Sequence, residues 1–259
     1  MSERGISIKE SIIIFIYTFT LHVLFYLPFA ALNHFLQDRN LNRASNQVQF
    51  WGGIIAYLCL VKFLYLKNNC KLKLGYKPKI KEYIYMFLFV IGYNLMRDNI
   101  FTFFYNLNLD NIMSIYSSFF ELDLISSILI APVFEEIIFR GFFLKQLSLK
   151  YSKVTAIIIS SLYFGIFHFE IHQGISALIF GIVIAWVYLK SNSLVLCIFI
   201  HSISNFYYSI LENYSIAYKS IMVEFNMFQL LLGVALLVIA YNLFKTSLQI
   251  NRENIDLNT

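Results

Sequence analysis

The sequence predicts an all-α, polytopic membrane protein with about eight transmembrane helices around a set of buried ionisable residues. Composition is the first observation behind this prediction: 59% of the 259 residues are hydrophobic and 14% are charged, whereas soluble proteins average about 25% charged residues. The number of apolar segments is the second. A helix needs about 20 mostly apolar residues to cross a bilayer, so eight crossings with short loops leave no room for a separate soluble domain.

Eight apolar segments follow one another along the chain, and we expect each to form one span. They run over residues 12–32, 50–66, 83–105, 122–147, 154–169, 174–189, 194–210 and 225–244. The first is too long for the core of a signal peptide, so we expect it to be retained. The third contains Arg97 and Asp98 and the fourth contains Pro132, which makes them the least regular. The polar tail after Lys245 is expected to be loose.

Basic residues are concentrated in every second loop, and this pattern predicts the orientation of the chain in the membrane. The second, fourth and sixth connections and the C-terminal tail are rich in lysine, whereas the odd connections contain only Arg39, Arg43 and Lys219. The positive-inside rule then places both termini of this multi-pass protein on the cytoplasmic side of the cell membrane. Because the basic residues separate apolar segments instead of lining one polar face, the net charge of +5 predicts no nucleic-acid partner.

Ionisable and polar residues inside the predicted spans are the candidates for function. A charged side chain at the bilayer centre costs at least ~2.5 kcal/mol, so each needs a partner or a role. Four such groups occur: Arg97 with Asp98, Glu135 and Glu136 with Arg140, His168 with nearby His172, and His201 with Asn205. Counted from the lysine-bearing loops, Glu135, His168, His201 and Asn205 all lie roughly 15 to 22 Å deep, on three different spans. These four side chains are therefore expected to meet.

Several of these residues also have a purely structural interpretation. The four-residue spacing puts Glu136 and Arg140 on one helix face as an ion pair, and turns Glu135 about 100° away from that face. Arg97 and Asp98 are expected to contact neighbouring helices rather than to catalyse a reaction. A lone buried histidine or asparagine usually makes a hydrogen bond between helices. The coincidence of depth is what indicates a site.

A carboxylate, two imidazoles and a carboxamide at one depth match the chemistry of water activation. Glutamate and histidine can transfer the protons of a water molecule near neutral pH. An imidazole with an asparagine amide one helical turn away can donate hydrogen bonds to an oxyanion that forms on a peptide carbonyl. The residue types therefore favour a reaction in which an activated water molecule takes part.

Three motifs resemble those of the CPBP intramembrane protease family, which includes the type II CAAX prenyl endopeptidases and many bacterial Abi-type proteins. They are EExxxR from Glu135 to Arg140, FxxxH from Phe164 to His168, and HxxxN from His201 to Asn205. Each motif alone is weak, but three in order on three apolar segments form a specific signal. The resemblance covers roughly residues 122–210.

The resemblance implies an intramembrane endopeptidase with its active site inside the helical bundle. The catalytic residues that it implies are Glu135, His168, His201 and Asn205. The carboxylate, assisted by the first histidine, would activate the attacking water, and the second histidine and the asparagine would stabilise the oxyanion. Glu136 and Arg140 would support the helix that carries the carboxylate.

Two versions of the mechanism remain open, one without a cofactor and one with zinc. His168 and His172 stand four residues apart, as two zinc ligands on a helix can, and Glu135 with His201 would complete a tetrahedral shell. A site limited to the shared motifs would use Glu135, His168 and His201. We favour the metal-free version, because His172 lies outside the motifs and a zinc-bound His201 could not donate to the oxyanion.

The resemblance also divides the chain, which we expect to be one structural unit, into three parts. Residues 1–121 hold N-terminal transmembrane helices, residues 122–210 form the catalytic core with its three motifs, and residues 211–259 contain the last transmembrane helix and the polar tail. The implied substrate is a membrane-embedded or lipidated peptide or protein, cleaved for peptide maturation or bacteriocin self-immunity. The alternatives are a non-proteolytic scaffold or immunity protein on the same fold and a small transporter; the absence of repeated halves counts against the transporter.

Overall fold

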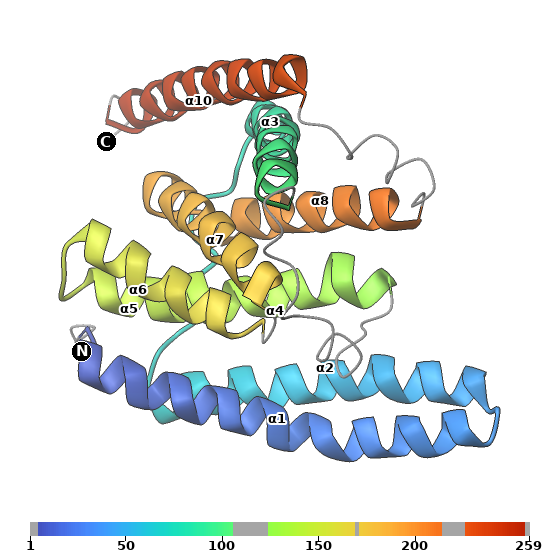
Figure 1. Cartoon of the computed structure of the whole chain (residues 1–259). Helices are drawn as coiled ribbons and strands as arrows, with labels where there is room; N and C mark the ends of the chain where they lie inside the picture. Colours follow the sequence, from blue (N-terminus) through green and yellow to red (C-terminus); the bar gives the residue numbers. More distant parts are fainter. Residues whose placement is uncertain (1–4, 106–123, 169–170, 214–225, 257–259) are drawn as a thin grey trace. The chain divides into compact units, whose positions relative to one another are not determined.

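The computed structural model describes residues 5–105, 124–168, 171–213 and 226–256 (Figure 1). Within these ranges the regular structure is helical and no strand forms; one isolated bridge joins Gly75 to Ser193. The prediction of an all-α protein is confirmed. The chain separates into two compact units, the first formed by Met1–Gly75 with Met113–Leu194 and the second by Tyr76–Ile112 with Val195–Thr259.

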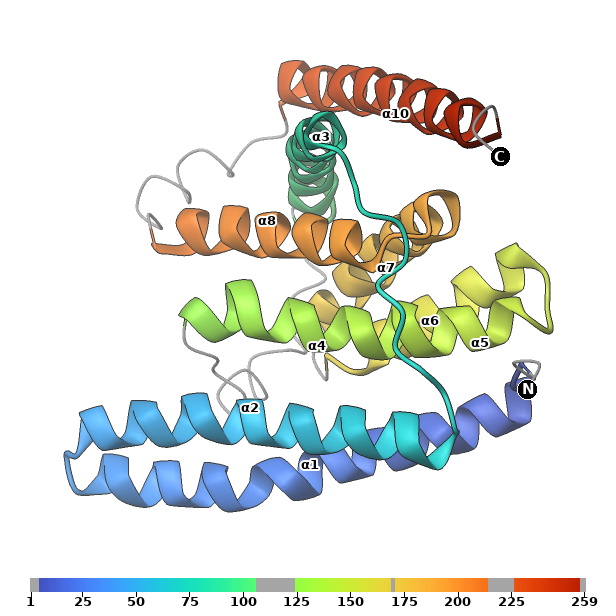
Figure 2. The same ribbon diagram turned by 180° about the vertical axis from the view of Figure 1, so that it is seen from behind.

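The first unit is built from two helical hairpins and a composite helix. Its elements are α1 (Ile8–Asp38), α2 (Asn42–Lys67), η1 (Ser126–Ile130), α4 (Ala131–Ile138), η2 (Phe139–Leu144), α5 (Lys145–Ser148), α6 (Lys153–Ile166) and α7 (Ile171–Ser191). Helices α1 and α2 lie side by side, as do α6 and α7 (Figures 1 and 2). Helix α4 contacts α2, and η2 contacts both α6 and α7. The composite helix, which consists of η1, α4, η2 and α5, is thus the element to which both hairpins attach.

Helix α1 starts at a capping box and is fixed there to α6. The Ser7 side chain accepts from the backbone N–H of Glu10, and the Glu10 carboxylate accepts from the Ser7 N–H. One turn later, the hydroxyl groups of Ser11 and Tyr163 are 2.7 Å apart. The rings of Phe15 and Tyr163 stack with their centroids 4.5 Å apart. The N-terminal helix is therefore packed against α6 from its first turns.

The fourth predicted span is helical throughout its described residues, but two segments of it are π-helical instead of α-helical. The backbone N–H of Ala131 donates to the carbonyl of Ser126, five residues earlier, which is the π-helical pattern. Pro132 follows at the start of α4 and has no N–H to continue the α-helical ladder. A second π-helical segment, η2, begins at Phe139. The Glu135–Glu136 pair thus lies on a short α-helix between two π-helical segments, a feature that often accompanies functional sites.

The second unit contains α3 (Ile80–Tyr105), α8 (Leu194–Asn213) and α10 (Met227–Asp256), with α8 starting at the last residue of the first unit. Helices α3 and α10 approach closely where two glycines face each other. A Cβ atom on Gly92 would lie 2.8 Å from the carbonyl oxygen of Gly233, and one on Gly233 would lie 2.9 Å from that of Gly92. Small residues at a helix crossing let the backbones come together in this way.

The expected loose tail after Lys245 is wrong, because α10 continues to Asp256. A long-range contact explains the extension. The Ser247 hydroxyl donates to the buried carboxylate of Glu82 at 2.9 Å, and the same carboxylate accepts from the backbone N–H of Lys79 at 2.9 Å. The C-terminal helix is thereby bonded to the first turn of α3.

Four of the described helices are long and apolar enough to cross a membrane: Ile8–Asp38, Arg43–Lys67, Gln173–Ser191 and Met227–Gln249. Two shorter apolar helices, Lys153–Ile166 and Leu194–Ser209, fall on two further predicted spans. Large apolar side chains such as Ile16 and Leu231 are exposed, as expected of residues that face lipid. These helices indicate a membrane protein, and the count of eight spans stays a prediction.

We expect Gly233→Val to lower the free energy of unfolding by about 1–3 kcal/mol, because the new side chain would meet the Gly92 carbonyl oxygen and the Met96 backbone nitrogen at 2.9 and 3.0 Å. Thermal unfolding in detergent measures this loss. Gly53→Ala is the control, since a Cβ at Gly53 meets no atom within 4 Å and alanine favours the helix. Equal losses in both variants would contradict the close crossing.

Candidate active site

Glu136 and Arg140 form the expected ion pair, and it is almost completely buried. Arg140 Nη1 lies 2.8 Å from Glu136 Oε1, with exposed side-chain fractions of 1% and 0%. Nη2 of the same guanidinium donates to the carbonyl of Gly181 on α7 at 3.2 Å. The guanidinium carbon also lies 4.5 Å from the centre of the Phe164 ring on α6. This one side chain therefore joins the composite helix to α6 and α7.

Glu135 faces away from this pair, as its position one residue earlier predicts. Its Oε1 accepts a hydrogen bond of 3.2 Å from the hydroxyl of Tyr57 on α2, and the residue is 7% exposed. The Tyr57 ring stacks on Phe134, with centroids 5.1 Å apart. A second tyrosine of α2, Tyr65, donates to the carbonyl of Ile137 at 3.0 Å. Two buried hydroxyl groups of α2 therefore bind α4, and one of them binds the candidate base.

His168 lies directly after α6, where its ring is oriented by the backbone of its own motif. Nδ1 is 2.8 Å from the carbonyl oxygen of Phe164. A carbonyl only accepts hydrogen bonds, so Nδ1 carries the proton and the lone pair of a neutral ring lies on Nε2. The Phe164 ring meets the His168 ring edge-on at 4.8 Å. Phe164 thus lies against both the Arg140 guanidinium and the histidine, which connects the EExxxR and FxxxH motifs.

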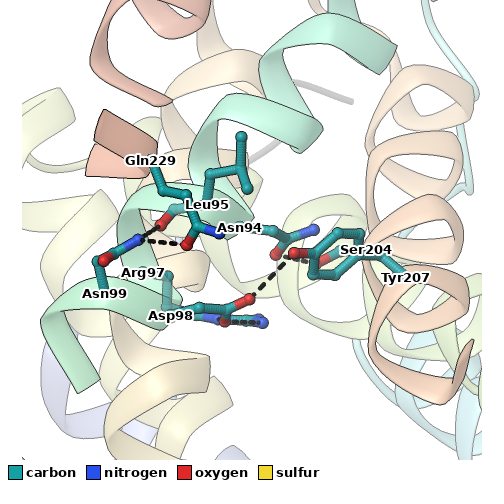
Figure 3. Close-up of polar contacts among 8 residues, drawn as sticks. All are labelled: Asn94, Leu95, Arg97, Asp98, Asn99, Ser204, Tyr207 and Gln229. Carbon is teal, nitrogen blue, oxygen red and sulfur yellow. Dashed lines mark hydrogen bonds and ion pairs between the residues drawn. The ribbon is translucent and has the colours of Figure 1, made fainter. Parts of the chain in front are cut away.

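His201 and Asn205 lie on α8 in the second unit, one helical turn apart, with His201 3% exposed. Two hydrogen bonds from this helix reach α3 (Figure 3). The Ser204 hydroxyl donates to Asn94 Oδ1 at 3.2 Å, and the Tyr207 hydroxyl donates to Asp98 Oδ2 at 3.1 Å. These contacts lie beside the HxxxN face and limit rotation of α8 about its axis.

Arg97 and Asp98 contact neighbouring helices, as expected. Arg97 donates through Nε and Nη2 to Asp98 Oδ1, at 2.9 and 2.7 Å, which leaves Oδ2 for Tyr207 on α8 (Figure 3). The guanidinium of Arg97 also lies 5.7 Å from the ring centre of Tyr208. Asn99, one position further along α3, donates to the side chain of Gln229 on α10 at 3.4 Å. The polar side of α3 therefore holds both other helices of its unit.

The motifs are distributed over the two units. Glu135 and His168 lie in the first unit together with the supporting ion pair, whereas His201 and Asn205 lie in the second. Within the first unit, the first two motifs meet through Phe164. The meeting of Glu135 with His201 and Asn205 stays a prediction.

The part of the chain that the structure describes contains no group of side chains arranged to bind zinc. No three histidine, cysteine, aspartate or glutamate side chains there are grouped to hold a metal ion. The side chain of His172 lies outside the described residues. Both the metal-free version and the zinc version therefore stay predictions.

Sequence reasoning missed two buried residues near Glu135. His22 on α1 is 7% exposed, and its ring centre lies 5.0 Å from those of both Tyr57 and Phe167. The rule that selects ionisable residues inside predicted spans applies equally to His22, so that signal was present. No such sequence signal pointed to Tyr57, because tyrosines are frequent in this chain and its partner Glu135 lies 78 residues away.

A comparison with protein families gives one match. The model of the family described as Type II CAAX prenyl endopeptidase Rce1-like matches residues 117–207. The matched region contains all three motifs, from Glu135 to Asn205. No curated protein and no solved structure shows significant similarity to the chain. The match confirms the resemblance stated from the motifs and supports a peptidase of the CAAX-protease type.

We expect Arg140→Met to lower the free energy of unfolding by about 3–5 kcal/mol, because it leaves the Glu136 carboxylate buried without its cation. The double variant Glu136→Leu with Arg140→Met should recover much of this loss, since no isolated charge remains. Thermal unfolding of the purified proteins compares the two. If the double variant is no more stable than Arg140→Met alone, the loss in Arg140→Met does not come from the unpaired charge of Glu136.

Tyr207→Phe is expected to destabilise the second unit by about 1.5–3 kcal/mol, because it removes a hydrogen bond to a charged carboxylate. Tyr208→Phe is the matched control: Tyr208 is 51% exposed, and phenylalanine keeps the ring that faces Arg97. Chemical unfolding in detergent measures both. If Tyr207→Phe costs no more than the control, the contact between α3 and α8 does not contribute to stability.

Proposed function

We propose that this chain is an intramembrane endopeptidase that hydrolyses a peptide bond of a membrane-embedded or lipidated substrate. One observation carries the proposal: of two adjacent buried glutamates, Glu136 is neutralised by Arg140, whereas Glu135 is directed to a tyrosine hydroxyl. A structural ion pair needs only one carboxylate. Inside a membrane helix the second carboxylate also needs a partner or a role, and a hydrogen bond from a tyrosine leaves it able to accept a proton. The family match over residues 117–207 supports the same activity.

In the proposed reaction, Glu135 is the general base for a water molecule, assisted by His168 Nε2. The carboxylate takes one proton as the water oxygen attacks the carbonyl carbon of the scissile bond. His201 and Asn205 donate hydrogen bonds to the resulting oxyanion. Glu135 then returns the proton to the leaving nitrogen, the C–N bond breaks, and the products are a carboxylate and an amine.

The surrounding side chains prepare Glu135 and His168 for these steps. The bond from Tyr57 orients the Glu135 carboxylate, and the bond to the Phe164 carbonyl fixes the tautomer of His168. Burial keeps competing water away and strengthens each electrostatic interaction. We place the protein in the cell membrane as a multi-pass protein with both termini in the cytoplasm, on the basis of its loop lysines. Peptide maturation and bacteriocin self-immunity are the biological roles that fit this activity.

We expect Glu135→Gln to lower kcat by about 10²–10⁴-fold, since the amide fills the same space but cannot accept a proton. The assay uses protein in nanodiscs and quenched fluorescent peptides, one with a prenylated CAAX terminus and one with an unmodified apolar terminus. Asp38→Asn is the control, because that carboxylate is 67% exposed. All variants are compared at equal folded concentration, verified by thermal unfolding.

Each result of this assay separates the proposal from an alternative. Cleavage that survives Glu135→Gln would disprove the proposed site. A biological role that persists in Glu135→Gln cells, without cleavage by the wild type, would favour a scaffold or immunity protein. Activity lost to a strong zinc chelator and restored by zinc would replace the metal-free version by the zinc version and keep the endopeptidase.

A further inference from the structure

The first helical hairpin contributes two side chains to the surroundings of Glu135, although it contains none of the three motifs. Tyr57 of α2 donates to Glu135 Oε1 at 3.2 Å. His22 of α1 lies behind it, with the two ring centres 5.0 Å apart. A hairpin that looks like two generic membrane helices therefore forms part of the carboxylate environment.

Two aromatic neighbours hold the Tyr57 ring in place. One face stacks on Phe134, the residue before Glu135, with an interplanar angle of 2°. His22 packs against the ring from α1, and Tyr57 as a whole is 5% exposed. A ring enclosed in this way cannot turn its hydroxyl elsewhere, so the hydrogen bond fixes the orientation of the carboxylate. Orientation of the reacting group is a large part of catalytic efficiency.

His22 contacts a neighbour of each candidate catalytic residue of the first unit. Its ring centre lies 5.0 Å from that of Tyr57, which binds Glu135, and 5.0 Å from that of Phe167, the residue before His168. Its Nδ1 is buried and has no hydrogen-bond partner among the residues that the structure describes. Buried polar atoms of this kind are normally satisfied by ordered water or by a ligand. The His22 ring contacts Tyr57 and Phe167, which adjoin Glu135 and His168, so a water molecule of the active site is a partner that fits this position.

We propose that Tyr57 and His22 are positioning residues for the Glu135 carboxylate, and that His22 Nδ1 hydrogen-bonds a water molecule of the active site. This inference rests on the proposed endopeptidase function. Tyr57 sets the direction of the carboxylate, and His22 holds the tyrosine ring while it orders the water next to it. The α1–α2 hairpin is then a functional part of the enzyme.

Tyr57→Phe tests the first half, because it keeps the stacked ring and removes only the hydroxyl. We expect kcat on the prenylated CAAX peptide to fall about 10- to 100-fold with KM essentially unchanged. Tyr65→Phe is a closely matched control: it lies on the same helix, is 8% exposed, and loses a bond to α4 that ends on a backbone carbonyl. Tyr65→Phe should lower the melting temperature without lowering kcat. An equal fall of kcat in both variants would overturn the positioning role.

The role of His22 is tested by comparing the kcat values of two variants. His22→Phe preserves an aromatic ring for packing but has no ring nitrogen, whereas His22→Asn packs less well and keeps a polar atom near the Nδ1 position. A role in ordering water predicts a higher kcat for His22→Asn, and a role in packing alone predicts a higher kcat for His22→Phe. His34→Asn, at a histidine of α1 whose side chain is 78% exposed, controls for a general effect on this helix.

A measurement without substrate separates this inference from the proposed function. With 3-fluorotyrosine at position 57, the ¹⁹F resonance in nanodiscs should shift in Glu135→Gln, while the same label at position 65 should not. Absence of that shift would overturn the Tyr57–Glu135 contact, whatever the activity. If Glu135→Gln abolishes cleavage but Tyr57→Phe cleaves like wild type, this inference fails and the proposed function stands. Cleavage that survives Glu135→Gln would overturn both.

Discussion

A guanidinium and a carboxylate that are both withdrawn from solvent have to satisfy each other, and Arg140 and Glu136 do so at 2.8 Å. The rest of the first unit depends on this contact, because the arginine has donors left over and directs one to the Gly181 carbonyl of α7. Its flat face lies over Phe164, whose carbonyl orients His168. The ion pair thus sets the relation between three helices and turns the neighbouring glutamate about 100° away around the helix.

The second unit repeats this arrangement with different residues. Arg97 occupies one oxygen of Asp98, and the other oxygen receives Tyr207 from the helix that bears the HxxxN motif. Buried charge pairs add little stability compared with apolar contacts of the same size. Loss of one partner nevertheless destabilises the fold strongly, because the other charge stays buried without compensation. Each unit therefore uses a pair of low net benefit to fix the orientation of a helix that carries candidate catalytic groups.

Local spacing made part of this structure predictable. The Glu136–Arg140 pair follows from the four-residue repeat, and the helices follow from apolar segment length. Contacts between distant segments were not predictable in this way: the Ser247–Glu82 bond extends α10 beyond its apolar stretch, and Tyr57 meets Glu135 across 78 residues. Pro132 predicted an irregularity in the fourth span but not the π-helical segments, because hydropathy does not encode the hydrogen-bond register of a helix.

The two π-helical segments also determine how this region can change its length. A π-helical turn closes its hydrogen bond over one residue more than an α-helical turn. Loss of one residue within η2 would let this turn close with the α-helical hydrogen-bond pattern, because the wider π-helical turn is what accommodates the additional residue. The helix on either side of the deletion would then keep its rotation about the axis. Phe142, Phe143 and Leu144 are all completely buried there, so a deletion that preserves this rotation also preserves most of their packing. Single-residue deletions in η2 should therefore be tolerated better than deletions in α4, where the same change would rotate the following residues by about 100°.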